Sequence, residues 1–291
     1  MKLQEQFIKA KDGHDIRVDI FEPETQAKGI VQLVHGFGEY IGHYVTVIDF
    51  FLGQGYICVM HDQRGHGAYA AKDPSQRGVS KAYGLFLEDL ARVRDLIAQD
   101  FEDLPVYLMG HSMGGNIVLN FLLRQEENQQ SYEKVIVESP WLDLAEQPPK
   151  MAQKMAAIIG KLNPKIRVHA GLRVDLIAHD VDMVKSVVDD GYFHDLLSLR
   201  LFTQIKEAGQ FALAHAQNIH VPLLLLGAEE DGIVSIAAIR QFAATANPNI
   251  TYLEIKGGYH ALHIDTEAET TMKKILEFIQ ASEKIQKNKL K

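Results

Sequence analysis

The chain has 291 residues, a formal net charge of −8 and an apolar fraction of 46%, which is ordinary for a globular protein. The negative charge argues against broad nucleic-acid binding, and the N-terminal residues 1–6 lack the apolar segment of a secretory signal. No apolar run approaches the length of a membrane span, and Cys58 is the only cysteine, so an internal disulfide is excluded. We therefore expect a cytoplasmic protein.

Apolar runs and helical spacings alternate along most of the chain. Two early strands, near Gln6–Ala10 and Asp15–Phe21, are expected to form an antiparallel edge. Phe86, Leu90, Val93 and Ile97 recur at i, i+4, i+7 and i+11, which predicts one face of a helix. Runs rich in Val, Ile and Leu predict strands at residues 29–34, 56–60, 106–109, 134–138, 221–227 and 250–255. This alternation predicts an α/β fold, with a mostly parallel sheet flanked by helices.

Residues 141–216 interrupt the alternation. They carry helical spacing, for example at Met151, Met155, Ile158, Ile159 and Leu162. We interpret this stretch as a helical cap inserted over the carboxyl edge of the sheet. The core domain is then expected to comprise residues 1–140 and 217–291.

The strand at 106–109 runs into Gly110-His111-Ser112-Met113-Gly114, and an apolar helical stretch follows without a breaker. A strand, a sharp turn with small residues around a serine, and a helix form the setting that a nucleophile elbow requires. Free N–H groups and the helix dipole at this helix start favour a developing negative charge nearby. The alternative is that Ser112 merely caps the helix.

A serine nucleophile needs an imidazole base, and the imidazole needs a carboxylate to fix its tautomer. Three acids, Glu229, Glu230 and Asp231, follow the strand at 221–227, and His260 follows the next strand after a Gly-Gly-Tyr turn. We expect Asp231 to be the acid, since Gly232 lets the chain turn there, and Glu229 and Glu230 to face solvent. His260 is the expected base, with His263 supporting it.

The strand at 29–34 ends in His35-Gly36-Phe37-Gly38-Glu39. The loop after such a strand is expected to supply one backbone N–H to an oxyanion, and the residue after the nucleophile supplies the other. These amides would be those of Phe37 and Met113. We expect His35 to be a structural hydrogen-bonding residue.

The segment His61-Asp62-Gln63-Arg64-Gly65-His66-Gly67 could suggest a metal site or a phosphate clamp. No second cluster of acids and histidines with metal-ligand spacing accompanies it. We expect a loop tied by an Asp62–Arg64 interaction instead. His169, His179, His194 and His215 are scattered, so neither a metal nor another cofactor is predicted.

The segments around His35, Asp62, Ser112, Asp231 and His260 together resemble the monoacylglycerol lipase and lysophospholipase group of α/β-hydrolases, within the serine aminopeptidase S33-like family. The similarity runs from about Asp12 to the last helix and is weakest between Trp141 and His220. The resemblance implies an α/β-hydrolase fold. It also implies Ser112 as nucleophile, Asp231 as acid, His260 as base, and Phe37 and Met113 as oxyanion amides.

One departure from the family pattern concerns the Arg-Gly-His-Gly loop. The family usually has a serine shortly after this loop, where this chain has Ala68-Tyr69-Ala70. This affects the expected geometry of the loop and leaves the three catalytic positions as they are.

We therefore expect a serine hydrolase that cleaves carboxylic esters (EC 3.1.1), acting on monoacylglycerol-type or lysophospholipid-type lipids through an acyl-enzyme. Met151 and Met155 are candidates for contact with the acyl chain, because methionine adapts to irregular apolar pockets. A small-ester carboxylesterase, an amidase or peptidase with the same triad, and a ligand-binding receptor without turnover remain alternatives. The basic C-terminal residues Lys284, Lys287, Lys289 and Lys291 suggest a transient membrane-surface contact. The oligomeric state is not predicted.

Overall fold

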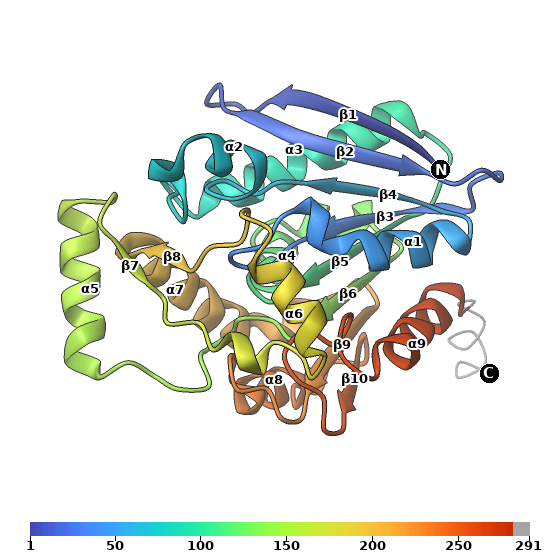
Figure 1. Ribbon diagram of the computed structural model, residues 1–291. Helices are drawn as coiled ribbons and strands as arrows, with labels where there is room; N and C mark the ends of the chain where they lie inside the picture. Colours follow the sequence, from blue (N-terminus) through green and yellow to red (C-terminus); the bar gives the residue numbers. More distant parts are fainter. Residues whose placement is uncertain (282–291) are drawn as a thin grey trace.

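The computed structural model describes residues 1–281, and the four C-terminal lysines lie outside this range. Its centre is an eight-stranded sheet in which all neighbours pair in parallel from β4 onward, while β1 and β2 are antiparallel at one edge (Figure 1). In spatial order the strands are β1 (Lys2–Lys9), β2 (Asp15–Glu22), β4 (Tyr56–His61), β3 (Gly29–Val34), β5 (Val106–His111), β6 (Lys134–Glu138), β9 (Leu223–Ala228) and β10 (Ile250–Ile255). The predicted fold class and the antiparallel edge are confirmed.

Helices cover both faces of the sheet, so the central strands are buried on both sides. One face packs against α1 (Val45–Gly53) and α9 (Ala268–Gln280). The other packs against α3 (Gly84–Asp100), α4 (Met113–Arg124) and α8 (Ile236–Ala243). The predicted apolar stripe of α3 is confirmed, because Phe86, Leu90, Val93 and Ile97 are all buried. The short helix α2 (Gly67–Lys72) follows β4.

The segment between β6 and β9 contains the elements that do not belong to the large sheet. These are α5 (Lys150–Leu162), β7 (Arg167–His169), α6 (Val181–Val188), β8 (Leu196–Ser198) and α7 (Leu199–His215). Strands β7 and β8 form a separate two-stranded sheet. Helix α5 stands at the left margin of Figure 1, away from the large sheet.

Helix α7 lies inside the range 141–216 that we expect to form the cap, yet it contributes to the core. Its buried residues Leu201, Ile205, Ala208 and Ala212 belong to the same apolar cluster as α4. It also packs against α5, so it connects the outer helix to the main body. The described chain contains no helix that combines the length and the hydrophobicity needed to cross a bilayer.

Candidate active site

Ser112 lies in the turn between β5 and α4, in a backbone conformation that few residues adopt. Its φ is +54° and its ψ is −116°, outside the regions open to most L-residues. Such strain persists only where the surrounding structure enforces it, and it is common at functional sites. Here the backbone N–H of Ser112 donates to the carbonyl of Glu138 at 3.0 Å, and Trp141 N donates to Ser112 O at 2.9 Å.

Glycines flank this turn because neighbouring backbone lies directly against them. A Cβ added at Gly110 would lie 2.7 Å from the carbonyl oxygen of Gly114. A Cβ at Gly114 would overlap the carbonyl oxygens of Val34 and His35. The Gly-x-Ser-x-Gly pattern is therefore a steric requirement of this strand–turn–helix unit.

Three predicted residues meet at the carboxyl edge of the sheet. Ser112 Oγ lies 3.0 Å from His260 Nε2, and His260 Nδ1 lies 2.8 Å from Asp231 Oδ2. With the His260 proton on Nδ1, that nitrogen donates to Asp231, and Ser112 donates its hydroxyl proton to Nε2. All three residues are buried. Ser112 follows β5, Asp231 follows β9 and His260 follows β10, so one sheet edge assembles the group.

The other acids of the Asp231 loop are oriented differently. Glu229 and Glu230 are exposed, and the Glu229 carboxylate accepts the backbone N–H of Gly257 at 2.9 Å. Asp231 Oδ1 accepts the N–H groups of Ile233 and Val234, both at 2.9 Å. These two bonds hold the carboxylate so that Oδ2 faces His260.

The charges around His260 favour its protonated form, so this form is more stable here than it is in an isolated imidazole. Burial lowers the pKa of His260, but the carboxylates of Asp231, Glu39 and Glu138 outweigh it, and the pKa is raised above its ordinary value. An imidazolium formed after proton transfer from Ser112 is therefore stabilised at this position.

The predicted oxyanion amides lie beside the serine. Phe37 and Ser112 both line the same cavity, and Met113 is the first residue of α4. Within residues 1–281, neither the Phe37 amide nor the Met113 amide donates a hydrogen bond to another group. Unpaired N–H groups at a helix start and an adjacent loop are the donors that an oxyanion requires.

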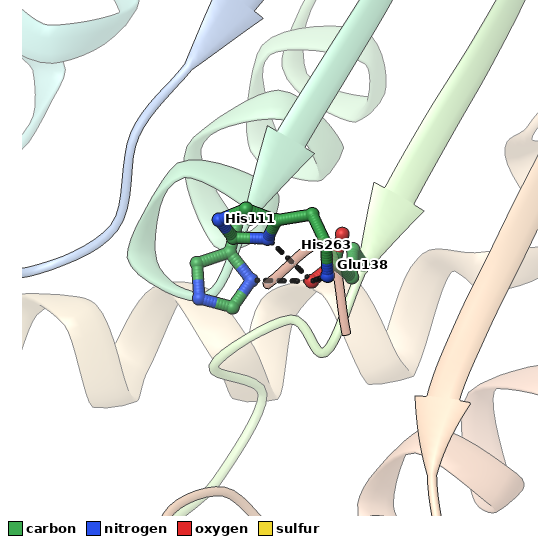
Figure 2. A group of neighbouring side chains, drawn as sticks. All are labelled: His111, Glu138 and His263. Carbon is green, nitrogen blue, oxygen red and sulfur yellow. Dashed lines mark hydrogen bonds and ion pairs between the residues drawn. The ribbon is translucent and has the colours of Figure 1, made fainter. Parts of the chain in front are cut away.

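A second buried polar group lies behind His260, and His263 is the one of its three members to which the sequence analysis gave a role, as a support for His260. Figure 2 shows the imidazole rings of His111 and His263 directed at one oxygen of the Glu138 carboxylate, Oε1, which is 3.2 Å from His111 Nδ1 and 2.9 Å from His263 Nδ1. The signal for Glu138 in the sequence is that it ends the otherwise apolar run Val135-Ile136-Val137. Glu39, which accepts from Gly36 N at 2.6 Å and from the Tyr44 hydroxyl at 2.8 Å, was likewise missed.

His111, Glu138 and His263 are residue types that bind metals, and their polar atoms lie within 4.8 Å of one another. The carboxylate oxygen lies at ion-pair distance from both imidazoles, and burial raises the pKa of Glu138 less than the two histidines lower it. The opposite shift occurs at His263, whose pKa is raised by Glu138 in spite of burial. We therefore interpret the group as a buried ion-paired cluster.

A cavity of about 680 Å³ opens above Ser112 and His260. Its apolar walls come from the main body and from the segment between β6 and β9; they include Phe37, Trp141, Leu144, Ala152, Ala156, Leu172, Leu176, Ile177, Val187, Leu197, Leu199, Phe202, Ile233, Val234 and Ile264. Polar residues such as Glu146, Gln147, Gln153, His169 and Arg173 also line it. The volume falls within the range of sites for small organic ligands.

Met151 and Met155 do not line this cavity. Their exposed fractions are 68% and 53%, and the opposite face of α5 lines the cavity with Ala152, Gln153 and Ala156. The spacing predicts the helix correctly, but it cannot tell which of its two faces turns inward. We therefore do not retain these methionines as candidate substrate contacts.

The loop after β4 is held in place by hydrogen bonds and ion pairs. The predicted Asp62–Arg64 interaction is wrong, because both side chains have other partners. Arg64 Nε donates to Asp89 at 2.6 Å, and its Nη1 donates to Asp12 at 2.7 Å. Asp62 instead accepts from the N–H groups of Ile41 and Ala68, at 3.1 and 3.0 Å. The better partners come from distant segments, which local spacing does not reveal.

His35 has the structural role that the sequence predicts. Its Nε2 accepts the backbone N–H of Gln63 at 2.9 Å, and its Nδ1 lies 2.8 Å from Gly36 O. This pattern requires a neutral imidazole with the proton on Nδ1, and burial lowers the pKa of His35 accordingly.

Two proteins similar to this chain in sequence are lipid hydrolases by name. It is 26% identical to a monoacylglycerol lipase of Mycolicibacterium smegmatis, over 92% of this chain and 93% of that protein. It is 27% identical to the phospholipase YtpA of Bacillus subtilis, over 84% of this chain and 92% of that protein.

Solved structures give the same fold. The monoacylglycerol lipase of Paleococcus ferrophilus superposes with a TM-score of 0.79 at 26% identity, covering 90% of this chain and 98% of that one. A soluble variant of the monoglyceride lipase of Saccharomyces cerevisiae, in complex with a substrate analog, superposes with a TM-score of 0.82 at 20% identity, covering 94% of both chains.

Residues 25–267 match the family described as "Serine aminopeptidase, S33", which is most of the chain. The resemblance to the monoacylglycerol lipase and lysophospholipase group is thereby confirmed, and the chain belongs to the serine aminopeptidase S33 family of α/β-hydrolases.

Proposed function

We propose that this protein, a carboxylic ester hydrolase, cleaves monoacylglycerol-type or lysophospholipid-type esters with Ser112 as nucleophile, His260 as base and Asp231 as the orienting acid. The observation that carries the proposal is the hydrogen-bonded chain from Ser112 Oγ through His260 to Asp231, at the floor of a largely apolar cavity. The names of the relatives support a lipid substrate.

The proposed reaction proceeds in two steps. Ser112 Oγ attacks the ester carbonyl while His260 Nε2 takes its proton, and the Phe37 and Met113 amides stabilise the oxyanion. His260 then returns the proton to the leaving alcohol, and an acyl-enzyme remains. Water activated by His260 attacks this acyl group by the same route, which releases the acid and restores Ser112.

A lipid substrate fits the cavity better than a very short ester does. The walls are mostly apolar side chains, and a cavity of about 680 Å³ leaves room for more than an acetyl group. A peptidase that uses the same triad remains the second candidate, because the matched family is described as a serine aminopeptidase and Glu146 lines the cavity. A carboxylate at this position is of the charge that binds a substrate amino group.

The test is a comparison of initial rates on p-nitrophenyl esters with acyl chains of increasing length, on monoacylglycerol, on lysophosphatidylcholine and on amino-acid p-nitroanilides. We expect a maximum at medium or long acyl chains, turnover of monoacylglycerol, and a loss of roughly 10⁴–10⁶-fold in Ser112→Ala. Retained esterase activity in folded Ser112→Ala overturns the mechanism. A maximum at acetate without lipid turnover indicates a small-ester carboxylesterase, and turnover of anilides alone indicates a peptidase. Stable ligand binding without turnover indicates a receptor.

Helix α5 offers a surface for the lipid contact that the sequence analysis placed on the C-terminal tail. Its outer face exposes Met151, Met155, Ile158 and Leu162 at i, i+4, i+7 and i+11, with exposed fractions from 53% to 82%. Lys150, Lys154, Lys161 and Lys165 surround this stripe. No ion pair of their amino groups occurs within the part of the chain that the structure describes.

The charge around α5 is opposite to that of the whole protein. No Asp or Glu occurs between Glu146 and Asp175, although the net charge of the chain is −8. An apolar stripe between lysines is typical of a helix that lies in the interface of an anionic bilayer. Because the inner face of α5 lines the cavity, docking of the outer face would bring the cavity close to membrane lipids. A cytoplasmic location remains a prediction.

Sedimentation with vesicles tests this contact. We expect the protein to bind phosphatidylcholine vesicles that contain phosphatidylglycerol, less so at high salt, and Ile158→Glu to abolish binding without changing hydrolysis of a soluble ester. Val45→Glu, which alters an exposed apolar residue on α1, is the matched control and is expected to bind like the wild type. Equal binding of Ile158→Glu overturns the proposal. A concentration-dependent dimer that this variant loses assigns the face to a second copy instead.

A further inference from the structure

Glu138 connects the two loops that carry the proposed nucleophile and base. It is the last residue of β6, and its side chain is fully buried. Its backbone carbonyl accepts the N–H of Ser112 at 3.0 Å. Its carboxylate oxygen Oε1 lies 2.9 Å from His263 Nδ1 and 3.4 Å from the His263 backbone N–H, three residues beyond His260.

The carboxylate also lies next to the residue that precedes the nucleophile. Glu138 Oε1 is 3.2 Å from Nδ1 of His111 (Figure 2). The His111 ring lies 4.8 Å from the ring of His260 and 4.9 Å from that of His263. One buried carboxylate thus contacts His111, whose ring packs against the base, and His263, whose ring packs against His111. On its other side, the His263 ring stacks on Tyr44 at 5.0 Å.

The charged neighbours of His260 come from several elements. Asp231 follows β9, Glu39 follows β3, and Glu138 ends β6, while His111 packs against the His260 ring from the end of β5. Of these charged groups within residues 1–281, Asp231 is the one that hydrogen-bonds the imidazole. Glu39 and Glu138 act at longer range, and burial weakens the solvent screening of their charges.

We infer that Glu138 is a positioning residue for the proposed hydrolysis. Its ion pair with His263 fixes the His260 loop relative to the Ser112 turn, and its negative charge favours the imidazolium that forms when Ser112 loses its proton. Glu138 touches neither Ser112 Oγ nor the His260 ring through its carboxylate, so it acts through its neighbours. This inference rests on the proposed function, since it assumes that Ser112 and His260 do the chemistry.

Glu138→Gln tests the inference because it removes the charge and nearly preserves the shape. We expect kcat on a soluble ester to fall by about 10–100-fold, as for the loss of outer partners of an active-site group, with KM little changed. The acid limb of the kcat/KM profile is expected to move to lower pH, because one of the carboxylates that favour the His260 imidazolium is lost. A role in packing alone does not move this limb.

A double-mutant cycle with His263→Gln supplies the second measurement. If the ion pair acts as a unit, the double variant loses no more than the worse of the two single variants. Glu254→Gln, a change on β10 at a carboxylate paired with Arg240, is the control and is expected to keep the wild-type rate and profile. Thermal unfolding of each variant separates loss of the fold from loss of turnover. If Glu138→Gln does not fold, the rate and the pH profile of His263→Gln test the inference instead.

Wild-type kcat and an unmoved acid limb in Glu138→Gln overturn the inference, as do losses that multiply in the double variant. These outcomes are separate from the test of the function itself. Ser112→Ala activity decides whether the triad hydrolyses esters, whereas the Glu138 variants decide only how the triad is held.

Discussion

At the scale of single residues, the protonation state of His260 decides when the proposed mechanism can operate. The base must be neutral to accept the Ser112 proton, so activity is lost as the pH falls through the pKa of His260. Asp231, Glu39 and Glu138 raise that pKa above its ordinary value in spite of burial. Protonation of His260 therefore begins at a higher pH than it would for an isolated imidazole.

We predict that kcat/KM declines through an acid limb whose midpoint lies above the ordinary value of 6.5. Replacing Asp231 by Asn removes the largest favourable interaction with the imidazolium, so the limb should move to lower pH and kcat should fall by about 10⁴-fold. Rate profiles of both proteins on a soluble ester provide the measurement. A rate that is flat from mildly acidic to neutral pH would count against His260 as base.

Gly114 has a different role, because it makes room for the backbone of β3 at the turn that carries Ser112. A Cβ at this position would overlap the carbonyl oxygens of Val34 and His35. Gly114→Ala should therefore destabilise the protein by about 1–3 kcal/mol or more, since backbone atoms must move. Gly53→Ala, where an added Cβ meets nothing within 4 Å, is the control and should leave stability nearly unchanged. Urea unfolding of the two variants compares them; equal midpoints would contradict the steric argument.

At the scale of elements, the loop after β4 depends on partners that lie far away in the sequence. Arg64, whose side chain is 8% exposed, joins this loop to Asp89 on α3 and to Asp12 in the turn between β1 and β2. Asp89 is also buried, so it needs the guanidinium close by. The ion pair therefore ties the antiparallel edge of the sheet to the helix that covers it.

Removing the Arg64 guanidinium is expected to lower the stability of the fold substantially. Arg64→Leu leaves the Asp89 carboxylate buried without its partner, and the free energy of unfolding should fall by about 3–5 kcal/mol. Arg92→Leu is the matched control on the same helix α3, because its pair with Asp95 is exposed and should contribute less than about 1 kcal/mol. Denaturant unfolding measures both, and a small effect of Arg64→Leu would show that the pair contributes little.

The sequence predicted the strands and the three site residues, but not the long-range side-chain partners, and the difference has a physical reason. The central strands could be recognised because burial on both faces requires uninterrupted Val, Ile and Leu runs, as in β9. Ser112, Asp231 and His260 could be found because each follows a strand of one parallel sheet, whose ends meet. Partners such as Arg64 with Asp89, or Glu138 with His263, depend on how distant segments pack, and no local pattern encodes that.

At the scale of the whole molecule, the sheet edge and the segment between β6 and β9 have different roles in the proposed mechanism. The reacting groups follow strands of one rigid sheet, whereas much of the cavity wall comes from α5 and the residues around it. A change in α5 should therefore affect which acyl chains are accepted more than it affects the chemical step. Ala156 is suited to test this, because it is buried on the inner face of α5 and lines the cavity.

Ala156→Phe adds a ring to the cavity wall and should exclude long acyl chains by steric overlap. We predict that the ratio of kcat/KM for a dodecanoyl ester to that for an acetyl ester falls at least about tenfold, which corresponds to about 1.4 kcal/mol of lost discrimination. Lys154→Gln, on the exposed part of the same helix, is the control and should keep the wild-type ratio. A proportional loss on both esters would mean that α5 supports the reacting groups themselves, and that the division between sheet edge and cavity wall does not hold.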